Sequence, residues 1–440
     1  MNAYLQLFDE IAPQLPGSHR PLMQFARGAA LARFSAEGFP SPREEEWRYT
    51  NISPIEKKLF KPAPAVAAAT ELNGAVDELL ERFVLADTDR VVLVNGHFSA
   101  ALSKLDDIPE PLFVESVGHL LHTDPERVES LINHNLDRDA HGLIGYNGAF
   151  FNDGVLIDVP AGHRVDRPLQ ILHIATRPDC AMVSRNLIRL GENSHLQLVE
   201  CYLGPEGVGY LTAAVTEAAV GEQARLDYYR IQQESDKAYH FNGLYVRQDT
   251  GARFNHHNID FGGLLARAET HTELGEDAEC KLTGLFLGRG RQHVDNHTLI
   301  QHRAPHGTSS ENYRGVLADR ARGVFQGRIV VHPKAQKTQA DMSNRNLLLS
   351  DDAEVDTKPQ LEILADDVKC SHGVTVGQLD AESVFYLQSR GVDEESARNM
   401  LTFAFANEMV EKIELPGLKD LVQDQLLDRF PQSGIRRDWL

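Results

Sequence analysis

Turns of one kind recur along residues 150–379, and this quasi-repeat constrains the fold more than any other feature of the chain. The turns are built from small and acidic residues, and they begin at Gly191, Gly221, Gly251, Gly275, Lys334, Asp351 and Asp366. The first four are separated by 30, 30 and 24 residues, and the last three by 17 and 15 residues, about half of the earlier interval. A repeat of this length is typical of a solenoid, in which each repeat packs on its neighbours.

The segments between these turns alternate apolar and polar residues, as strands do. They include Val155–Val159, Leu169–Ile174, His195–Tyr202, Arg225–Ile231, Lys281–Leu287 and Gly327–Val331. No helical pattern separates them, which favours a β-helix over leucine-rich or ankyrin repeats. An antiparallel sandwich or a cupin-like barrel is the alternative, but Asn-Gly hairpin turns between paired strands are scarce. We therefore predict a mainly β fold with a right-handed parallel β-helix as its core.

Helical patterns precede this core. Residues 76–84 and 124–136 have apolar positions spaced near 3.6 residues. The run Ser41–Glu44 has the pattern of an N-cap, a proline at the first helical position and a capping-box glutamate. Trp47 follows and is expected to anchor packing. We predict that residues 1–140 form an N-terminal helical domain.

Helical patterns also follow the core. Asp380 and Asp393 are each predicted to cap a helix, because an N-cap carboxylate accepts hydrogen bonds from free backbone amides. The second of these helices has a wider apolar surface than one buried face requires, so it is either core on both sides or a docking face for a partner. A last helix is predicted around Leu418–Phe430. We therefore divide the rest of the chain into a β-helix core, residues 141–379, and a C-terminal helical domain, residues 380–440.

Composition excludes several classes of function. The chain has 440 residues and a formal net charge of −20, which disfavours nucleic-acid binding and docking on anionic membranes, because both need clustered Lys and Arg. No apolar run approaches the roughly 20 residues of a membrane-spanning helix, and the N-terminus lacks the basic segment of a secretory signal. The four cysteines form no CxxC motif, as expected for free thiols in a reducing compartment. We expect a cytoplasmic protein.

The run Lys369-Cys370-Ser371-His372-Gly373 places a thiol and an imidazole two residues apart. In a strand, side chains at i and i+2 lie on the same face, about 6–7 Å apart. A thiolate and an imidazole suit iron or zinc, so Cys370 and His372 are candidate metal ligands. A buried cysteine beside a hydrogen-bonded histidine is the alternative interpretation. No HExxH, GxSxG or GxxxxGK[ST] motif is present, so we predict no catalytic residue and no nucleotide bound by this chain.

Six runs of distinctive sequence lie within residues 324–380. They are Phe325-Gln326-Gly327-Arg328-Ile329, Ala335-Gln336-Lys337-Thr338, Asn344-Arg345-Asn346-Leu347-Leu348-Leu349-Ser350, Lys358-Pro359-Gln360-Leu361-Glu362-Ile363, Asp366-Asp367-Val368-Lys369-Cys370-Ser371-His372-Gly373 and Thr375-Val376-Gly377-Gln378-Leu379-Asp380. Together they resemble the SufD-type subunit of the SUF iron–sulfur cluster assembly scaffold, in the SufB/SufD family. Outside this stretch the resemblance is thinner: Arg43–Thr50 and Asn147–Gly154 resemble the N-terminal helix of the family and the strand that opens its core.

The resemblance points to the D-type rather than to the sister B-type subunit. The B-type subunit carries a cysteine before its NLLLS-like run and a glutamate directly after the equivalent histidine. Residues 333–349 of this chain contain no cysteine, and Gly373 follows His372.

The resemblance implies a non-catalytic scaffold subunit. Such a subunit pairs with a B-type subunit (SufB-like) through the C-terminal end of its β-helix, and its helical tail binds an ABC-type ATPase subunit (SufC-like). A transient iron–sulfur cluster is shared with the partner, with His372 as a nitrogen ligand and Cys370 as a further candidate ligand. Whether the isolated chain forms a homodimer stays open.

A cytosolic β-helix enzyme acting on carbohydrate is the alternative function. Such enzymes usually carry a secretion signal and a line of acids and bases on one sheet. Here the paired acids Asp351-Asp352 and Asp366-Asp367 lie at predicted turns, where solvated side chains are expected.

Overall fold

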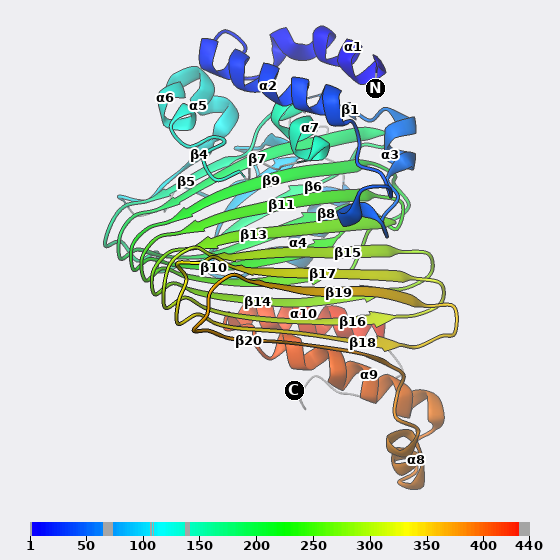
Figure 1. Ribbon diagram of the computed structural model, residues 1–440. Coiled ribbons are helices and arrows are strands. Elements are labelled where there is room, and N and C mark those ends of the chain that lie inside the picture. The colour runs from blue at the N-terminus through cyan, green and yellow to red at the C-terminus, as the bar shows by residue number, and fades with distance from the viewer. Residues whose placement is uncertain (1, 65–73, 106–107, 109, 137–140, 431–440) are drawn as a thin grey trace.

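The computed structural model describes residues 2–64, 74–105, 108, 110–136 and 141–430 (Figure 1). Its centre is a β-solenoid of eight coils, each with one strand in sheet A and one in sheet B. The sheet A strands of these coils are β5 (Val155–Val159), β7 (Cys180–Leu190), β9 (Leu211–Val220), β11 (Tyr239–Gln248), β13 (Leu265–Leu274), β15 (His293–His302), β17 (Arg322–Val331) and β19 (Glu354–Ile363). The sheet B strands are β6 (Leu169–Ile174), β8 (His195–Leu203), β10 (Arg225–Gln233), β12 (Arg253–Asp260), β14 (Glu279–Gly288), β16 (Thr308–Leu317), β18 (Gln339–Leu348) and β20 (Lys369–Gly377). The predicted β-helix core and all six predicted strands are confirmed.

Parallel pairing between successive coils explains the two turn intervals. His195 of β8 pairs with Arg225 of β10, and Thr308 of β16 pairs with Gln339 of β18, offsets of 30 and 31 residues. One coil therefore has the length of the longer interval. Each coil contains two turns, one at each edge of the solenoid. The late intervals are about half a coil long because each runs from a turn at one edge to the next turn at the other edge.

The turns that lead from sheet A to sheet B share one backbone conformation. Each of six successive turns contains a residue with φ between +56° and +64°, and these residues are Asn193, Gln223, Gly251, Asp277, His306 and Lys337. L-residues rarely adopt this region, although Asn and Asp adopt it more readily than most. The same chain reversal is thus repeated at the same edge of six successive coils.

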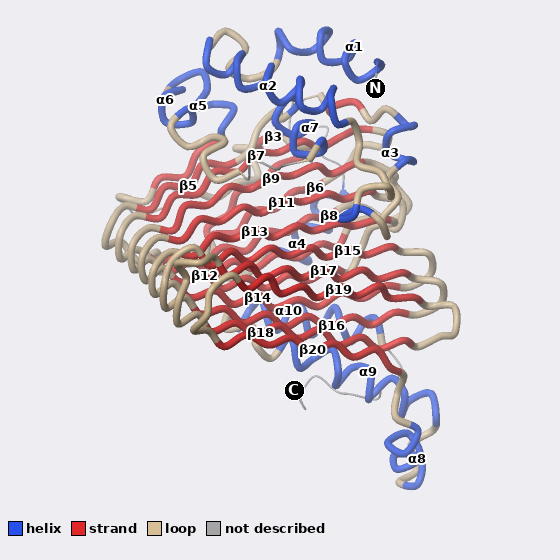
Figure 2. The backbone as a smooth tube through the Cα atoms, viewed as in Figure 1, coloured by secondary structure: helices blue, strands red, loops and turns tan. Residues whose placement is uncertain are grey.

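Helices and short strands cover the first coils (Figures 1 and 2). These elements are α1 (Asn2–Ile11), a 3-10 helix (Ala12–Gln14), α2 (Pro21–Glu37), a 3-10 helix (Glu45–Trp47), α3 (Ser53–Lys58), β1 (Lys61–Pro62), α4 (Gly74–Phe83), β2 (Asp89–Val94), β3 (His97–Phe98), β4 (Phe113–Ser116), α5 (Val117–Thr123), α6 (Pro125–Glu129) and α7 (Gly142–Phe150). β2 pairs in parallel with β6, and β4 pairs antiparallel with β5. The N-terminal region therefore contributes strands to both sheets. The domain boundaries at residues 140 and 379 stay predictions, and residues 137–140 and 431–440 lie outside the described residues.

Three N-terminal predictions need correction. Asn147–Gly154 does not open the core as a strand, because the chain is helical up to Phe150 in α7. Every residue of α7 except Gly148 is buried, and periodicity cannot separate such an apolar helix from a buried strand. Residues 124–136 form only the short helix α6, and Asn133 has a left-handed φ of +64° that is incompatible with a continuous helix.

The segment Arg43–Thr50 forms a single 3-10 turn rather than a longer helix. The predicted capping contact is present, since the Ser41 amide donates to Glu44 Oε1 at 2.8 Å. Trp47 is 2 % exposed, which confirms it as a packing anchor. The guanidinium of Arg267 lies 3.6 Å from the centre of the Trp47 ring, so this segment is fixed along the outer face of sheet A.

The three C-terminal helices are α8 (Ala381–Ser389), α9 (Glu394–Val410) and α10 (Pro416–Arg429). Both predicted caps are confirmed: Asp380 accepts from the amides of Glu382 and Ser383, and Asp393 accepts from the amide of Ser396. α9 and α10 lie on the outer face of sheet B, while α8 projects from the solenoid (Figure 1). No helix in the described ranges is both long and apolar enough to cross a lipid bilayer.

The solenoid interior is apolar along most of its length, but it also encloses ionisable groups. Leu226, Phe254 and Cys280 are stacked on successive strands and are fully buried. Glu311 of β16 is enclosed in the same interior. The Thr298 hydroxyl donates a 2.6 Å hydrogen bond to Glu311 Oε1, and Oε2 has no partner among the described residues. Burial raises the pKa of Glu311 to about 8, so its carboxyl is mostly protonated at neutral pH.

We predict that Glu311 makes the stability of the fold fall as the pH rises. The pKa of Glu311 is higher in the folded chain than the unfolded value of 4.5. Its contribution to the free energy of unfolding is therefore fully present below pH 4.5 and is lost as the pH rises to about 8. Glu311→Gln keeps the shape and cannot ionise. Thermal melts measure the melting temperature of the variant minus that of the unsubstituted chain at each pH. This difference should increase between about pH 5 and about pH 9.

Glu276→Gln is the control, because Glu276 is an exposed turn residue. A difference between Glu311→Gln and the unsubstituted chain that does not change with pH would contradict a neutral buried carboxyl.

Candidate functional site

The two predicted metal ligands lie on β20, the last strand of the solenoid. Cys370 pairs with Ala340 and His372 pairs with Met342, and both of these β18 residues are buried in the solenoid core. Alternate residues of a strand share a face, so Cys370 and His372 lie on the inward side of β20. The prediction that they share one face of a strand is confirmed, and their role as ligands stays a prediction.

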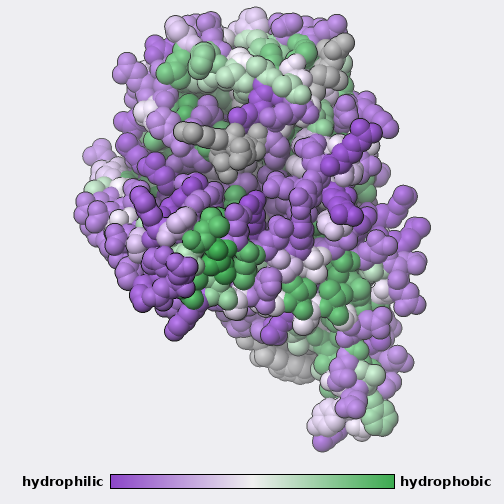
Figure 3. Space-filling model, in the orientation of Figure 1, coloured by the Kyte–Doolittle hydropathy of each residue, from purple (hydrophilic) through white to green (hydrophobic). Residues whose placement is uncertain are grey.

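The last coil is open because no further coil follows it. No described strand pairs with the outer edge of β19 or of β20. Two inward-facing apolar residues of this coil are consequently exposed: Ile363 is 43 % exposed and Val376 is 47 % exposed. Apolar patches appear on the part of the surface that carries this end of the molecule (Figure 3). An unpaired strand edge beside an exposed apolar core is a strong association surface.

Cys370 and His372 would supply two ligands if a metal bound here. Cys370 is half-buried against the core, and this burial raises the pKa of its thiol. His372 is exposed. Within the described ranges, no three His, Cys, Asp or Glu side chains are grouped so that they could hold a metal ion. Structural metal sites usually have four ligands, so a metal bound by these two residues would need further ligands from elsewhere.

The other cysteines have surroundings unsuited to ligation. Cys201 and Cys280 are fully buried in the protein. Burial raises the pKa of Cys201 to about 12, which disfavours the thiolate that binds metals. Cys180 is half-buried at the start of β7, far from β20 in sheet order.

Much of the wide apolar surface of α9 is covered within the chain. Phe403, Ala406 and Val410 are buried in a cluster with the outer face of sheet B and with Leu418 and Val422 of α10. This part of α9 is therefore core, whereas Ala404 is exposed and Leu401 and Phe405 are half-buried, so a docking role of α9 stays a prediction. The exposed aromatic residues of the C-terminal region lie instead on α8, where Phe385 is 70 % exposed and Tyr386 is 57 % exposed.

Sequence patterns missed these two aromatic residues. α8 is short, and its apolar residues do not form the regular stripe that marks a docking face. The exposure of Ile363 and Val376 was missed for another reason. Their alternation is that of core strands, and only the end of the coil stack leaves them uncovered.

Comparison with known proteins agrees with this architecture. Residues 173–405 match the family model described as "SUF system FeS cluster assembly, SufBD core domain". Residues 1–171 match the model of the SufBD protein N-terminal region. The chain belongs to the SufBD family.

Some of the relatives are named as SufBD family proteins, and others are named SufD. The chain is 30 % identical over 428 residues to an iron–sulfur cluster assembly SufBD family protein of Synechocystis, covering 94 % of this chain and 92 % of the relative. It is 30 % identical over 408 residues to the iron–sulfur cluster assembly protein SufD of Escherichia coli, covering 91 % and 92 %. It is also 28 % identical over 404 residues to SufD of Bacillus subtilis, covering 87 % and 89 %. The predicted resemblance to SufD-type proteins of the SUF system is confirmed.

Proposed function

We propose that this chain is a non-catalytic, cytoplasmic scaffold subunit that builds iron–sulfur clusters together with a B-type subunit and an ABC-type ATPase subunit. The nascent cluster is the cargo of the assembly. The open end of the solenoid, with Cys370 and His372 on its last strand, carries this proposal. The family match supports a place in cluster assembly, and the geometry of β19 and β20 supports the choice of surface.

The two free strand edges favour a β-rich partner. Unpaired amides and carbonyls along β19 and β20 can be satisfied by strands of a second protein, which extend both sheets. The same contact would bury Ile363 and Val376, whose exposure is costly in the isolated chain. A B-type subunit with the same kind of solenoid end offers both features. A homodimer of the isolated chain would use the same surface.

Incomplete ligation suits a scaffold. His372 would supply a nitrogen ligand and the B-type subunit a thiolate, with Cys370 as a second ligand or as a residue that shapes the interface. A cluster held across an interface is lost when the interface opens. The ligand set is therefore labile in the way that cluster transfer requires.

The ATPase subunit would bind at α8. This helix projects from the solenoid and exposes Phe385 and Tyr386, and aromatic residues commonly dominate the energy of protein interfaces. Only Gln378, Leu379 and Asp380 separate β20 from α8. A movement of α8 driven by the ATPase would thus act directly on the strand that carries Cys370 and His372.

We predict that His372→Ala abolishes cluster formation in the complex reconstituted with both partners, while the chain stays folded. His372 is exposed, so its removal should change the free energy of unfolding by no more than about 0.5 kcal/mol. Iron and sulfide content and the absorbance of the complex measure the cluster. Cys370→Ser should give a milder loss, and an equal loss would make Cys370 a ligand.

His119→Ala, an exposed histidine of α5 near the other end of the molecule, is the matched control and should leave the cluster yield unchanged. A normal cluster yield from a folded His372→Ala complex would refute the ligand role of His372.

We predict that the double substitution Phe385→Ser and Tyr386→Ser weakens binding of the ATPase subunit at least about tenfold without lowering the melting temperature. Both side chains are exposed, so they contribute little to the fold. Calorimetric titration with the ATPase subunit measures the affinity.

Phe25→Ser is the matched control, since Phe25 of α2 is 78 % exposed and lies on the opposite end of the molecule. Equal affinities of the α8 variant and the control would assign the ATPase to another surface.

A further inference from the structure

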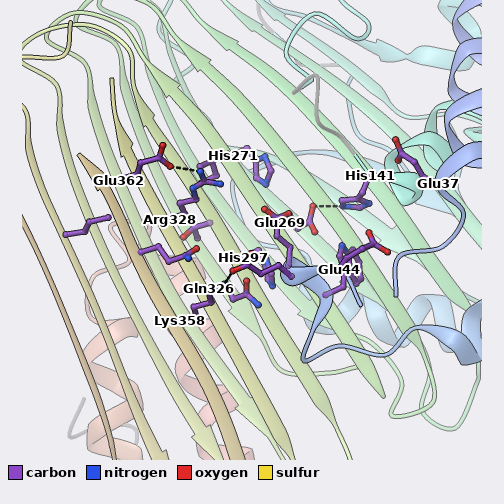
Figure 4. Close-up of a pocket in the computed structure, with 17 residues that line it drawn as sticks. Glu37, Glu44, His141, Glu269, His271, His297, Gln326, Arg328, Lys358 and Glu362 are labelled. Carbon is purple, nitrogen blue, oxygen red and sulfur yellow. Dashed lines mark hydrogen bonds and ion pairs between the residues drawn. The ribbon is translucent and has the colours of Figure 1, made fainter. Parts of the chain in front are cut away.

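A pocket of about 680 Å³ lies on the outer face of sheet A (Figure 4), whereas Cys370 and His372 lie in sheet B. Its floor is formed by β13, β15, β17 and β19. Its wall is formed by the N-terminal segment that contains Glu44, Glu46 and Trp47. We call this space the sheet A pocket.

Three of the sequence runs that carry the family resemblance meet at the sheet A pocket. Gln326 and Arg328 come from the run Phe325–Ile329, and Lys358 comes from the run Lys358–Ile363. The wall comes from Arg43–Thr50. None of these side chains has a part in the proposed cluster site. Cluster binding therefore does not account for these three runs, whereas a ligand in the sheet A pocket would.

The wall of the pocket is fixed to its floor by buried charges. Arg267 is 1 % exposed and donates to Glu269 and Asp295 at 2.7 Å each. The same guanidinium donates to the Glu46 carbonyl at 3.1 Å and lies against the Trp47 ring. His141 bonds the other oxygen of Glu269 at 2.9 Å. The pocket is therefore preorganised, which lowers the entropic cost of binding a ligand.

Both cations of the pocket lie on one side of it. Arg328 and Lys358 project from the strands there, with Glu362 beside Arg328, whereas Glu37 and Glu44 lie on the other side (Figure 4). Among the described residues each cation forms a surface ion pair, Arg328 with Glu362 at 2.5 Å and Lys358 with Glu45. Exposed pairs of this kind contribute little to stability, so a ligand can replace them.

Gln326 is an unpartnered polar group at the pocket. It is 8 % exposed, and its Nε2 donates no hydrogen bond to any described residue. A buried donor without a partner is energetically unfavourable. Rotation of the amide by half a turn exchanges its nitrogen and oxygen, so Gln326 can turn this donor into the pocket.

We infer that the sheet A pocket binds a small zwitterion of the amino-acid or short-peptide class. The carboxylate would lie on the strand side, beside Lys358, Arg328 and the amide of Gln326. The ammonium group would face the carboxylates of the wall, Glu37, Glu44 and Glu46. This binding activity is separate from cluster assembly and does not depend on it.

Calorimetric titration of the full chain tests this inference, with the proteinogenic amino acids in one arm and di- and tripeptides in the other. At least one arm should bind at millimolar concentration or tighter, and the tighter arm identifies the source of the zwitterion. The N-acetylated and the C-terminally amidated forms of the best ligand should each bind at least about tenfold more weakly, since each lacks one charged contact. Absence of binding in both arms, or equal binding of the blocked forms, would overturn the inference.

Two variants locate the ligand. Gln326→Leu and Lys358→Gln should each weaken binding about tenfold, the loss expected for one hydrogen bond to a charged group. Lys281→Gln on the outer face of sheet B is the matched control for the lost positive charge and should bind normally. Unchanged affinity in both pocket variants would place the ligand elsewhere and overturn the inference. Circular dichroism and the melting temperature confirm that each variant is folded.

Discussion

Parallel hydrogen bonding between successive coils is the interaction on which the rest of this structure depends. Every coil satisfies the backbone groups of its neighbours, so the stack can end only where something replaces the next coil. At the N-terminal end, β3 and β4 pair antiparallel with β2 and β5, and helices cover the first coils. At the C-terminal end the described chain offers β19 and β20 no such cover. The molecule is therefore asymmetric, with one closed end and one end ready for association.

The same pairing positions the residues of the proposed cluster site. Residues about thirty positions apart are stacked in columns, and His372 stands above Met342 and Glu311 in one of them. A rigid column fixes the backbone that carries the inward side chains of the last coil, as a ligand-bearing scaffold requires. The proposed cluster site uses the inward side of this end, while the sheet A pocket uses the outer face and reaches β19 as well. The two proposed sites thus share the last coil of the solenoid.

Local patterns in the sequence were sufficient to predict the core and much of the site. Alternation and repeated turns identified the strands, and Asp380 and Asp393 identified two helix starts, because these signals act over a few residues. Contacts between distant segments were not predictable in this way. α7 is buried on all sides, so its apolar run resembles a strand, and β2 joins sheet B only through pairing with β6. The wide apolar surface of α9 is explained by packing against sheet B, whose strands come from far earlier in the chain. The shared face of Cys370 and His372 was predictable from their spacing, whereas its inward direction followed only from the register with β18.

Hydrogen exchange of the full chain, with and without the B-type subunit, tests most directly whether the open end is the working surface. Exchange reports protection of individual backbone amides, and those on the free edges of β19 and β20 should slow markedly when partner strands bind them. Amides of α1 and α2 at the closed end should exchange at the same rate in both samples. Unchanged exchange along β19 and β20, together with new protection on any other surface, would contradict the account.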